Sequence, residues 1–144
     1  MADDEAQSRG TLLVVDDEVE LLELVRRRLT EEGYRVLTAQ QGADALVLAR
    51  QAHPDVILLD VVMPQMSGRE VLARLRAAQE TSDIPVIMIS ALGEEHEMAA
   101  SVGQGAVVHL SKPFNVKELV REIRLASRKH QDRHRGRPQP AAEG

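Results

Sequence analysis

Five short runs of apolar residues recur along this 144-residue chain, and longer stretches with helical spacing separate them. Short strands that alternate with helices predict an α/β fold, in which crossover helices join the strands of a parallel sheet. Four of the five runs are almost unbroken in apolar residues, as expected for strands that are buried on both faces. The predicted strands are Thr11–Val15, Arg35–Ala39, Val56–Leu59, Pro85–Ile89 and Ala106–Ser111.

Helices are predicted between and after these strands. Apolar residues recur at helical spacing over Leu21–Leu29 and again over Val116–Ile123, which is typical of amphipathic helices. A weaker helix is predicted over residues 94–102, and we expect it to be the loosest element because alanines fill most of its apolar positions. Three residues have the chemistry expected at helix ends: Gly33, Ser67 and Asn115.

The length of the chain limits it to one core, since a protein of this size buries about 68–70% of its unfolded surface. We expect one domain at residues 11–129, a flexible N-terminus at 1–10, and a flexible basic, proline-containing tail or linker at 130–144. The last 17 residues hold five basic and two acidic side chains, although the whole chain has a net charge of −5. Such a tail can contact an acidic partner, but a solvated linker is the simpler interpretation.

Composition excludes several classes of site. The chain has no cysteine, which rules out disulfides, thiolate zinc sites and cysteine nucleophiles. Its apolar runs are far shorter than the about 20 residues that a membrane helix needs, and the first residues are acidic, so we expect a cytoplasmic protein that does not enter the membrane. Tyr34 and Phe114 are the only aromatic residues, which disfavours nucleic-acid binding by base stacking.

Polar side chains stand where the apolar strands end: Asp16 and Asp17 after the first strand, Asp60 after the third, Ser90 after the fourth and Lys112 after the fifth. Ligands of open parallel sheets bind beyond the carboxyl ends of the strands, so these residues form a candidate site. Three carboxylates without histidine or cysteine suit a hard cation, and Mg²⁺ is the ion we expect. For Asp16 alone, a role as a turn residue is about equally good.

A magnesium site points to phosphate chemistry. Lys112 would then supply a positive charge for a phosphoryl oxygen, and Ser90 would supply a hydroxyl donor. A carboxylate in that setting can itself be the nucleophile, as in aspartyl-phosphate chemistry. Asp60 is the natural candidate for that role.

The residues from about 11 to 129 resemble the receiver domains of two-component response regulators. The resemblance rests on Leu-Leu-Val-Val-Asp-Asp-Glu at 12–18, Ile-Leu-Leu-Asp-Val-Val-Met-Pro at 57–64 with Ser67-Gly68, Ile-Ser-Ala at 89–91 and Leu-Ser-Lys-Pro-Phe at 110–114. It implies a single doubly wound, flavodoxin-like domain with five helices and a five-stranded parallel sheet in the order 2-1-3-4-5. It also implies bacterial two-component signalling, in which a sensor histidine kinase or phosphotransfer protein phosphorylates the domain and a downstream protein responds.

The resemblance implies a metal site around the phosphoacceptor. Asp60 would accept the phosphoryl group and would also contact Mg²⁺. Asp17 would bind Mg²⁺ directly, Asp16 would bind it through water, and the backbone carbonyl of Val62 would complete the metal shell.

The resemblance also implies a switch. Lys112 would pair with the phosphoryl group, Ser90 would move to bond it, and the Lys112–Pro113 peptide would be cis. The family usually has Tyr or Phe three residues before the lysine, where this chain has His109. Since an imidazole titrates near neutral pH, we predict pH-sensitive switching, which identical activation-induced shifts at about pH 6 and pH 8 would contradict. A partly exposed histidine without such a role is an equally good interpretation.

Two further departures bear on partners and on phosphoryl lifetime. Val107 and Val108 stand where receivers of the DNA-binding branch often carry acids that pair two copies, so a phosphorylation-dependent homodimer would need an apolar contact instead. Val62 and Leu92 occupy positions that tune hydrolysis, and neither side chain can orient a water by hydrogen bonding. We therefore predict a long-lived phosphoryl group, which Leu92→Glu or Val62→Asn should make shorter-lived.

Three functions follow from these observations. The favoured one is a phosphorylation-driven switch that acts through the face formed by the fourth helix, the fifth strand and the fifth helix, and that is not an enzyme with a separate substrate. One alternative is a pseudo-receiver that binds proteins constitutively and is never phosphorylated. Another is a Mg²⁺-dependent phosphohydrolase with an Asp-x-Asp pair, which Val62 argues against because the second acid would stand there.

Overall fold

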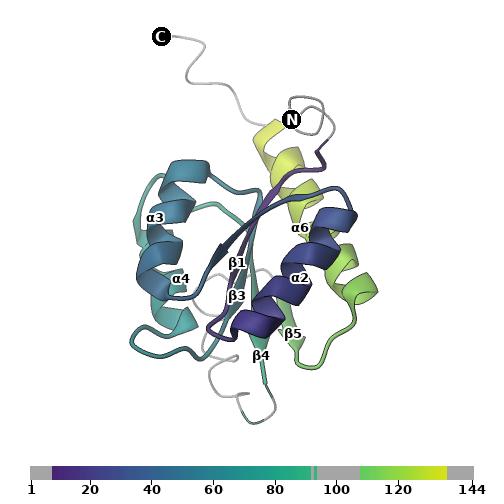
Figure 1. Cartoon of the computed structure of the whole chain (residues 1–144). Helices are drawn as coiled ribbons and strands as arrows, with labels where there is room; N and C mark the ends of the chain where they lie inside the picture. Colours follow the sequence, from purple (N-terminus) through teal and green to yellow (C-terminus); the bar gives the residue numbers. More distant parts are fainter. Residues whose placement is uncertain (1–7, 92, 94–107, 136–144) are drawn as a thin grey trace.

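A computed structural model describes residues 8–91, 93 and 108–135 (Figure 1). Its centre is a parallel sheet of five strands in the order β2-β1-β3-β4-β5. The strands are β1 (Thr11–Val15), β2 (Arg35–Ala39), β3 (Val56–Asp60), β4 (Val86–Ser90) and β5 (Val108–Ser111). This order confirms the predicted topology.

Four helices are described: α2 (Val19–Glu31), α3 (Gly42–Ala52), α4 (Gly68–Ala77) and α6 (Val116–Arg135). The helices α2 and α6 cover one face of the sheet, and α3 and α4 cover the other (Figure 1). The weaker helix predicted over residues 94–102 lies outside the described residues. Within the described ranges, no helix combines the length and the apolar composition that crossing a membrane requires.

Each face of the sheet has its own hydrophobic cluster. Leu12 of β1 belongs to the cluster beneath α2 and α6, whereas the next residue, Leu13, belongs to the cluster beneath α3 and α4. Successive strand residues point to opposite faces, so a strand between two helical layers must be apolar at every position. The strands β3 and β4 are buried along their whole length, as their unbroken apolar runs predicted.

The predicted helix ends are confirmed. The Ser67 hydroxyl accepts a 3.2 Å hydrogen bond from the N–H of Glu70, and the Asn115 side-chain oxygen accepts a 2.7 Å hydrogen bond from the N–H of Glu118. Both bonds satisfy backbone donors that a helix start leaves unpaired. Gly33 follows α2 with a φ of 101°, a conformation that glycine adopts without strain.

Some strand boundaries differ from the prediction by one residue. The strands β3 and β4 each extend one residue further, so Asp60 and Ser90 occupy the last strand positions instead of the first loop positions. The strand β4 begins at Val86 because Pro85 has no backbone N–H to give to a sheet. The predicted start of the fifth strand at residues 106–107 lies outside the described residues.

The last helix is longer than predicted. We expected the domain to end at residue 129, and the structure has residues 130–135 within α6, which ends at Arg135. No proline or glycine interrupts residues 116–135, and Gly136 is the first such residue beyond them. Lys, Arg and Gln have good helix propensity, which explains why the helix continues past its apolar part.

Candidate functional site

The parallel sheet brings the carboxyl ends of its strands to one edge. Val15 of β1 is in register with Leu59 of β3, so the residues that follow, Asp16 and Asp60, lie at the same level. The sheet order places β4 and β5 next to β3 at this edge. The strand ends therefore converge as the sequence predicted.

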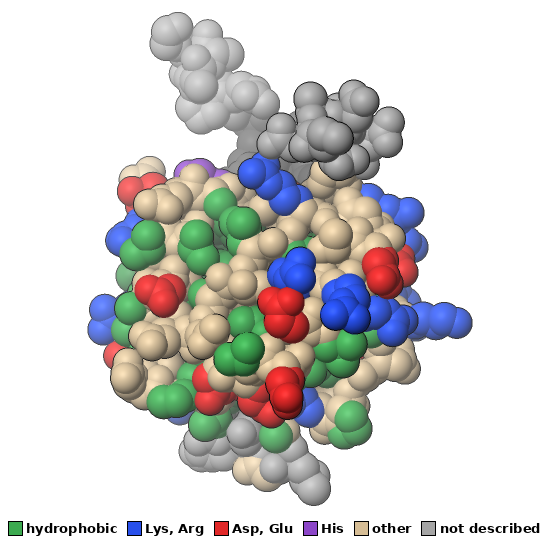
Figure 2. Space-filling view, viewed as in Figure 1, with side chains coloured by type: hydrophobic (Ala, Val, Ile, Leu, Met, Phe, Trp, Pro, Cys, Tyr) green, Lys and Arg blue, Asp and Glu red, His purple; other side chains and the backbone are tan. Residues whose placement is uncertain are grey.

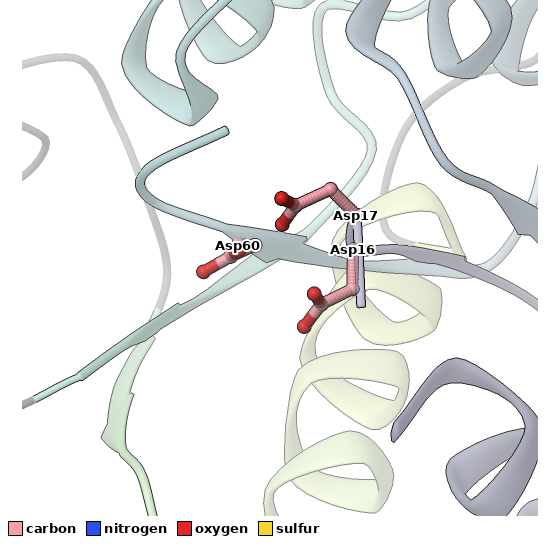
Figure 3. Close-up of side chains that lie close together, drawn as sticks. All are labelled: Asp16, Asp17 and Asp60. Atoms are coloured by element: carbon pink, nitrogen blue, oxygen red, sulfur yellow. The ribbon is translucent and has the colours of Figure 1, made fainter. Parts of the chain in front are cut away.

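Three carboxylates form a cluster at this edge. Asp16, Asp17 and Asp60 each offer an oxygen, and these oxygens lie within 4.8 Å of one another (Figure 3). Asp16 and Asp60 are each only 5% exposed, whereas Asp17 is exposed. The cluster thus has two buried members beneath one that faces solvent.

Lys112 is the counter-charge of this cluster. Its Nζ lies 3.1 Å from an oxygen of Glu18, 3.2 Å from Asp16 and 3.7 Å from Asp60. Burial alone would lower the pKa of Lys112, but the hydrogen bond to Glu18 and the negative charges of Asp60 and Asp16 outweigh it and raise that pKa above its ordinary value. The ammonium group is therefore charged at any physiological pH.

Burial is also the largest influence on Asp16. It raises the pKa of this carboxyl group, and the raised pKa persists although a 2.9 Å hydrogen bond from the N–H of Glu18 and the charge of Lys112 both act to lower it. A buried carboxylate beside other carboxylates is costly unless a cation is near. The ammonium of Lys112 supplies only part of that compensation.

The donor set fits a hard divalent cation. Three carboxylate oxygens converge here without a histidine ligand, which matches the oxygen ligands that Mg²⁺ prefers. A cation between them would also offset the desolvation that raises the pKa of Asp16. This acidic cluster is therefore a candidate metal site.

The loop after β3 returns tightly to the site. A Cβ atom added to Gly68 would lie 2.9 Å from the Cα of Val61 and would collide with the carbonyl oxygen of Asp60. The N–H of Gly68 donates a 2.7 Å hydrogen bond to the carbonyl of Val61. Only glycine fits at the first residue of α4 without displacing β3. The side chain of Val62, in the same loop, is 45% exposed.

Ser90 and His109, the two other predicted site residues, lie on β4 and β5. Ser90 is 3% exposed at the end of β4, and its carbonyl accepts a 2.7 Å hydrogen bond from the N–H of Lys112. The Lys112–Pro113 peptide is cis, as the resemblance implied. His109 is half-buried and in register with Met88, two residues before the end of β5. The structure therefore brings the aspartates and Lys112 together, while His109 lies two residues before the end of β5.

Sequence reasoning quoted two residues of this site, Glu18 and Gly68, as part of motifs but gave neither of them a role. Glu18 stands directly after the aspartate pair, but its contact with Lys112 joins positions 94 residues apart and left no periodic signal. Gly68 follows a helix cap, where glycine has no advantage in helix propensity over other residues. A glycine at a position where helix propensity does not favour it was the signal that could have indicated a close approach of another backbone segment.

The chain matches known proteins over most of its length. Residues 12–124 match the family described as "Response regulator receiver domain". The probable transcriptional regulator ycf27 of Porphyra purpurea is 41% identical over 118 residues, which make up 82% of this chain and 47% of that protein. The probable transcriptional regulatory protein TcrX of Mycobacterium tuberculosis is 39% identical over 119 residues, or 83% of this chain and 50% of that protein. The chain thus spans about half the length of these curated relatives.

A solved structure shares both the fold and the sequence pattern. The chemotaxis protein CheY4 of Vibrio cholerae superimposes with a TM-score of 0.76 at 32% sequence identity, covering 81% of this chain and 98% of that one. The fold, the family match and this likeness agree with one another. This chain belongs to the receiver domain family of two-component response regulators.

Proposed function

We propose that this chain is a phosphorylation-driven switch in which Asp60 accepts a phosphoryl group from a sensor histidine kinase or a phosphotransfer protein, in a Mg²⁺-dependent reaction in the cytoplasm. The observation that supports this most directly is the position of Lys112, whose Nζ lies 3.7 Å from an oxygen of Asp60 beside the carboxylate cluster. An ammonium group next to a candidate divalent-cation site suits the negative charge of a phosphoryl group.

The proposed transfer is a substitution at phosphorus. A carboxylate oxygen of Asp60 attacks the phosphorus of the donor phosphohistidine, and a new O–P bond forms as the P–N bond breaks. The electron pair of the broken bond goes to the imidazole, which takes up a proton from solvent. The product is an acyl phosphate on Asp60, so the domain is modified and no separate substrate is turned over.

The residues around Asp60 have distinct proposed roles. Asp17 and Asp60 would hold Mg²⁺, with Asp16 and the backbone carbonyl of Val62 as the further residues that would support it. When bound, Mg²⁺ supplies positive charge that neutralises the phosphoryl oxygens. Because the pKa of Lys112 is raised, its ammonium group stays protonated and pairs with a phosphoryl oxygen throughout the reaction.

The proposed output begins at the end of β4. The hydroxyl of Ser90 moves to bond the phosphoryl group, and His109 on the neighbouring β5 follows. Ser90 is in register with Ser111, so a shift at the end of β4 reaches β5. A face that includes β5 and α6 then binds a downstream protein or a second copy of the chain. Nucleic acid is not the proposed partner of these residues.

Acetyl phosphate tests this proposal without a kinase. The protein is incubated with acetyl phosphate, with and without Mg²⁺, and resolved on a phosphate-affinity gel. We expect one retarded band that requires Mg²⁺ and is absent from Asp60→Asn. Asp44→Asn, which changes an exposed aspartate of α3, is the matched control and should still be retarded. A protein that shows no retarded band under any condition would favour the pseudo-receiver.

A further inference from the structure

A groove of about 900 Å³ lies between α2 and α6, and none of the residues that line it belongs to the carboxylate cluster. Its floor is apolar and consists of Phe114, Val116 and Val120. Phe114 and Val116 are partly buried against the core beneath α2 and α6, and Val120 is 6% exposed. The floor is therefore a fixed part of the fold that offers apolar surface to an occupant.

The rim of this groove is basic. Lys117, Arg121 and Arg124 of α6 line it, together with Arg28 at the end of α2, and all four side chains are exposed. The spacing of the three α6 residues places them along one face of the helix. One acidic residue, Glu32, lies among them. In a chain with a net charge of −5, this concentration of positive charge is local.

The rim cations are weakly neutralised by their own chain. Arg28 and Arg121 have carboxylate partners at 3.8 Å and 3.9 Å, and exposed pairs at such distances contribute little. Among the described residues, no carboxylate is paired with Lys117 or Arg124. Figure 2 shows several Lys and Arg side chains on the right of the view, with acidic side chains beside them. The rim cations are available to an external anion.

We propose that this groove binds an acidic, amphipathic segment of a partner protein. The apolar side chains of that segment contact Phe114, Val116 and Val120, and its carboxylates pair with the rim cations. A nucleic-acid backbone would satisfy the cations but would leave the apolar floor uncovered, so a protein segment is the better match. Phe114 lies two residues after Lys112, so the groove begins next to the candidate phosphorylation site, although this binding does not require phosphorylation.

A synthetic peptide tests this surface on the unphosphorylated protein. The probe is a fluorescein-labelled helical peptide rich in Glu, with Leu at i, i+3, i+4 and i+7, and binding is followed by fluorescence anisotropy. Arg121→Glu combined with Arg124→Glu reverses two rim charges. Arg50→Glu combined with Arg74→Glu makes the same change in charge on the opposite helical layer. Circular dichroism checks that each variant is folded.

We expect saturable binding of the peptide that the rim variant weakens at least about tenfold and the control variant changes less than about twofold. No binding, or an equal loss in both variants, would overturn the proposal. A peptide with Ser in place of Leu that binds as tightly would also overturn it, because the floor would then have no role. Duplex DNA that bound more tightly than the peptide, and that lost its binding in the same rim variant, would also overturn the proposal. If deleting residues 1–7 raised peptide affinity about tenfold, the occupant would be the acidic start of this chain and not a partner.

Discussion

Lys112 is shared among three carboxylates, and its shortest contact is with a residue outside the predicted site. Its Nζ is 3.1 Å from Glu18 but 3.7 Å from Asp60. The side chain of Glu18 is 63% exposed, so water screens its attraction, whereas that of Asp60 is 7% exposed. In the proposed reaction, a phosphoryl group on Asp60 would have to compete with Glu18 for the ammonium group.

Replacing Glu18 with Gln is therefore expected to raise the initial rate of phosphorylation by acetyl phosphate, by up to about fivefold, because an exposed ion pair contributes at most about 1 kcal/mol. The rate is measured by quenched time points on a phosphate-affinity gel. Glu20→Gln removes the same charge from the first turn of α2 and should leave the rate unchanged. A slower Glu18→Gln variant, or equal acceleration of both, would contradict competition for Lys112.

Asp16 should make the stability of the metal-free protein depend on pH. Burial raises its folded-state pKa above that of the unfolded chain, so the folded state binds the proton more tightly. The stability gained by protonation is complete below the unfolded-state pKa and is lost as pH rises through the folded-state pKa. In EDTA, the melting temperature of the wild type minus that of Asp16→Asn should fall as the pH rises above about 4, where an unfolded aspartate ionises.

Thermal melts of both proteins at a series of pH values from about 4 upward test this expectation. Asp44→Asn, on the exposed surface of α3, provides the comparison for a carboxylate outside the cluster. If the difference between the wild type and Asp16→Asn stayed constant with pH, the pKa of Asp16 would be the same in the folded and unfolded states, which would contradict this prediction.

Among the elements, the start of α4 is the most constrained. Alanine usually stabilises a helix by about 1 kcal/mol relative to glycine. At Gly68 we expect the opposite sign, with a loss of about 1 to 3 kcal/mol in the free energy of unfolding, because the added methyl group would collide with the backbone of Asp60 and Val61. Urea unfolding measures the difference.

Ser67→Ala is the matched variant for this element, since it removes the helix cap without adding an atom. It should cost about 1 kcal/mol and leave phosphorylation of Asp60 intact. Gly68→Ala should both destabilise the protein and slow phosphorylation. A stabilised Gly68→Ala variant would show that β3 and α4 have more room than the structure gives them.

The elements were predictable to the extent that local signals defined them. Apolar runs defined β1 and β3, and the side chains of Ser67 and Asn115 defined two helix starts. The end of α6 was missed because its last turns have no apolar periodicity, so only propensity carries the helix to Arg135. The strand order came from the resemblance, because no local pattern states which strands are neighbours.

For the site, convergence of the strand ends was predictable, because parallel strands present their carboxyl ends at one edge. The aspartates and Lys112 were identified in that way. The contact between Glu18 and Lys112 was not, since it depends on where two long side chains point in the folded state. His109 lies on β5 as expected, but its role in a pH-sensitive switch stays a prediction.

At the scale of the whole molecule, the carboxylates form a site that a cation should stabilise. A ligand that binds only the folded state adds about 2.7 kcal/mol of stability at a concentration of 100 times its Kd. Mg²⁺ should therefore raise the melting temperature of the wild type by several degrees, and NaCl of equal ionic strength should not. Asp17→Asn, which changes the exposed member of the cluster, should remove the effect without unfolding the protein. Equal stabilisation of both proteins would place the cation elsewhere.

The central claim is that Asp60 itself becomes an acyl phosphate. Sodium borohydride reduces an aspartyl phosphate to homoserine, so reduction after treatment with acetyl phosphate and Mg²⁺, followed by peptide mass spectrometry, reads out the modified residue. The account predicts homoserine at position 60 and at no other aspartate. Homoserine at Asp16 or Asp17, or a protein left wholly unmodified, would contradict it.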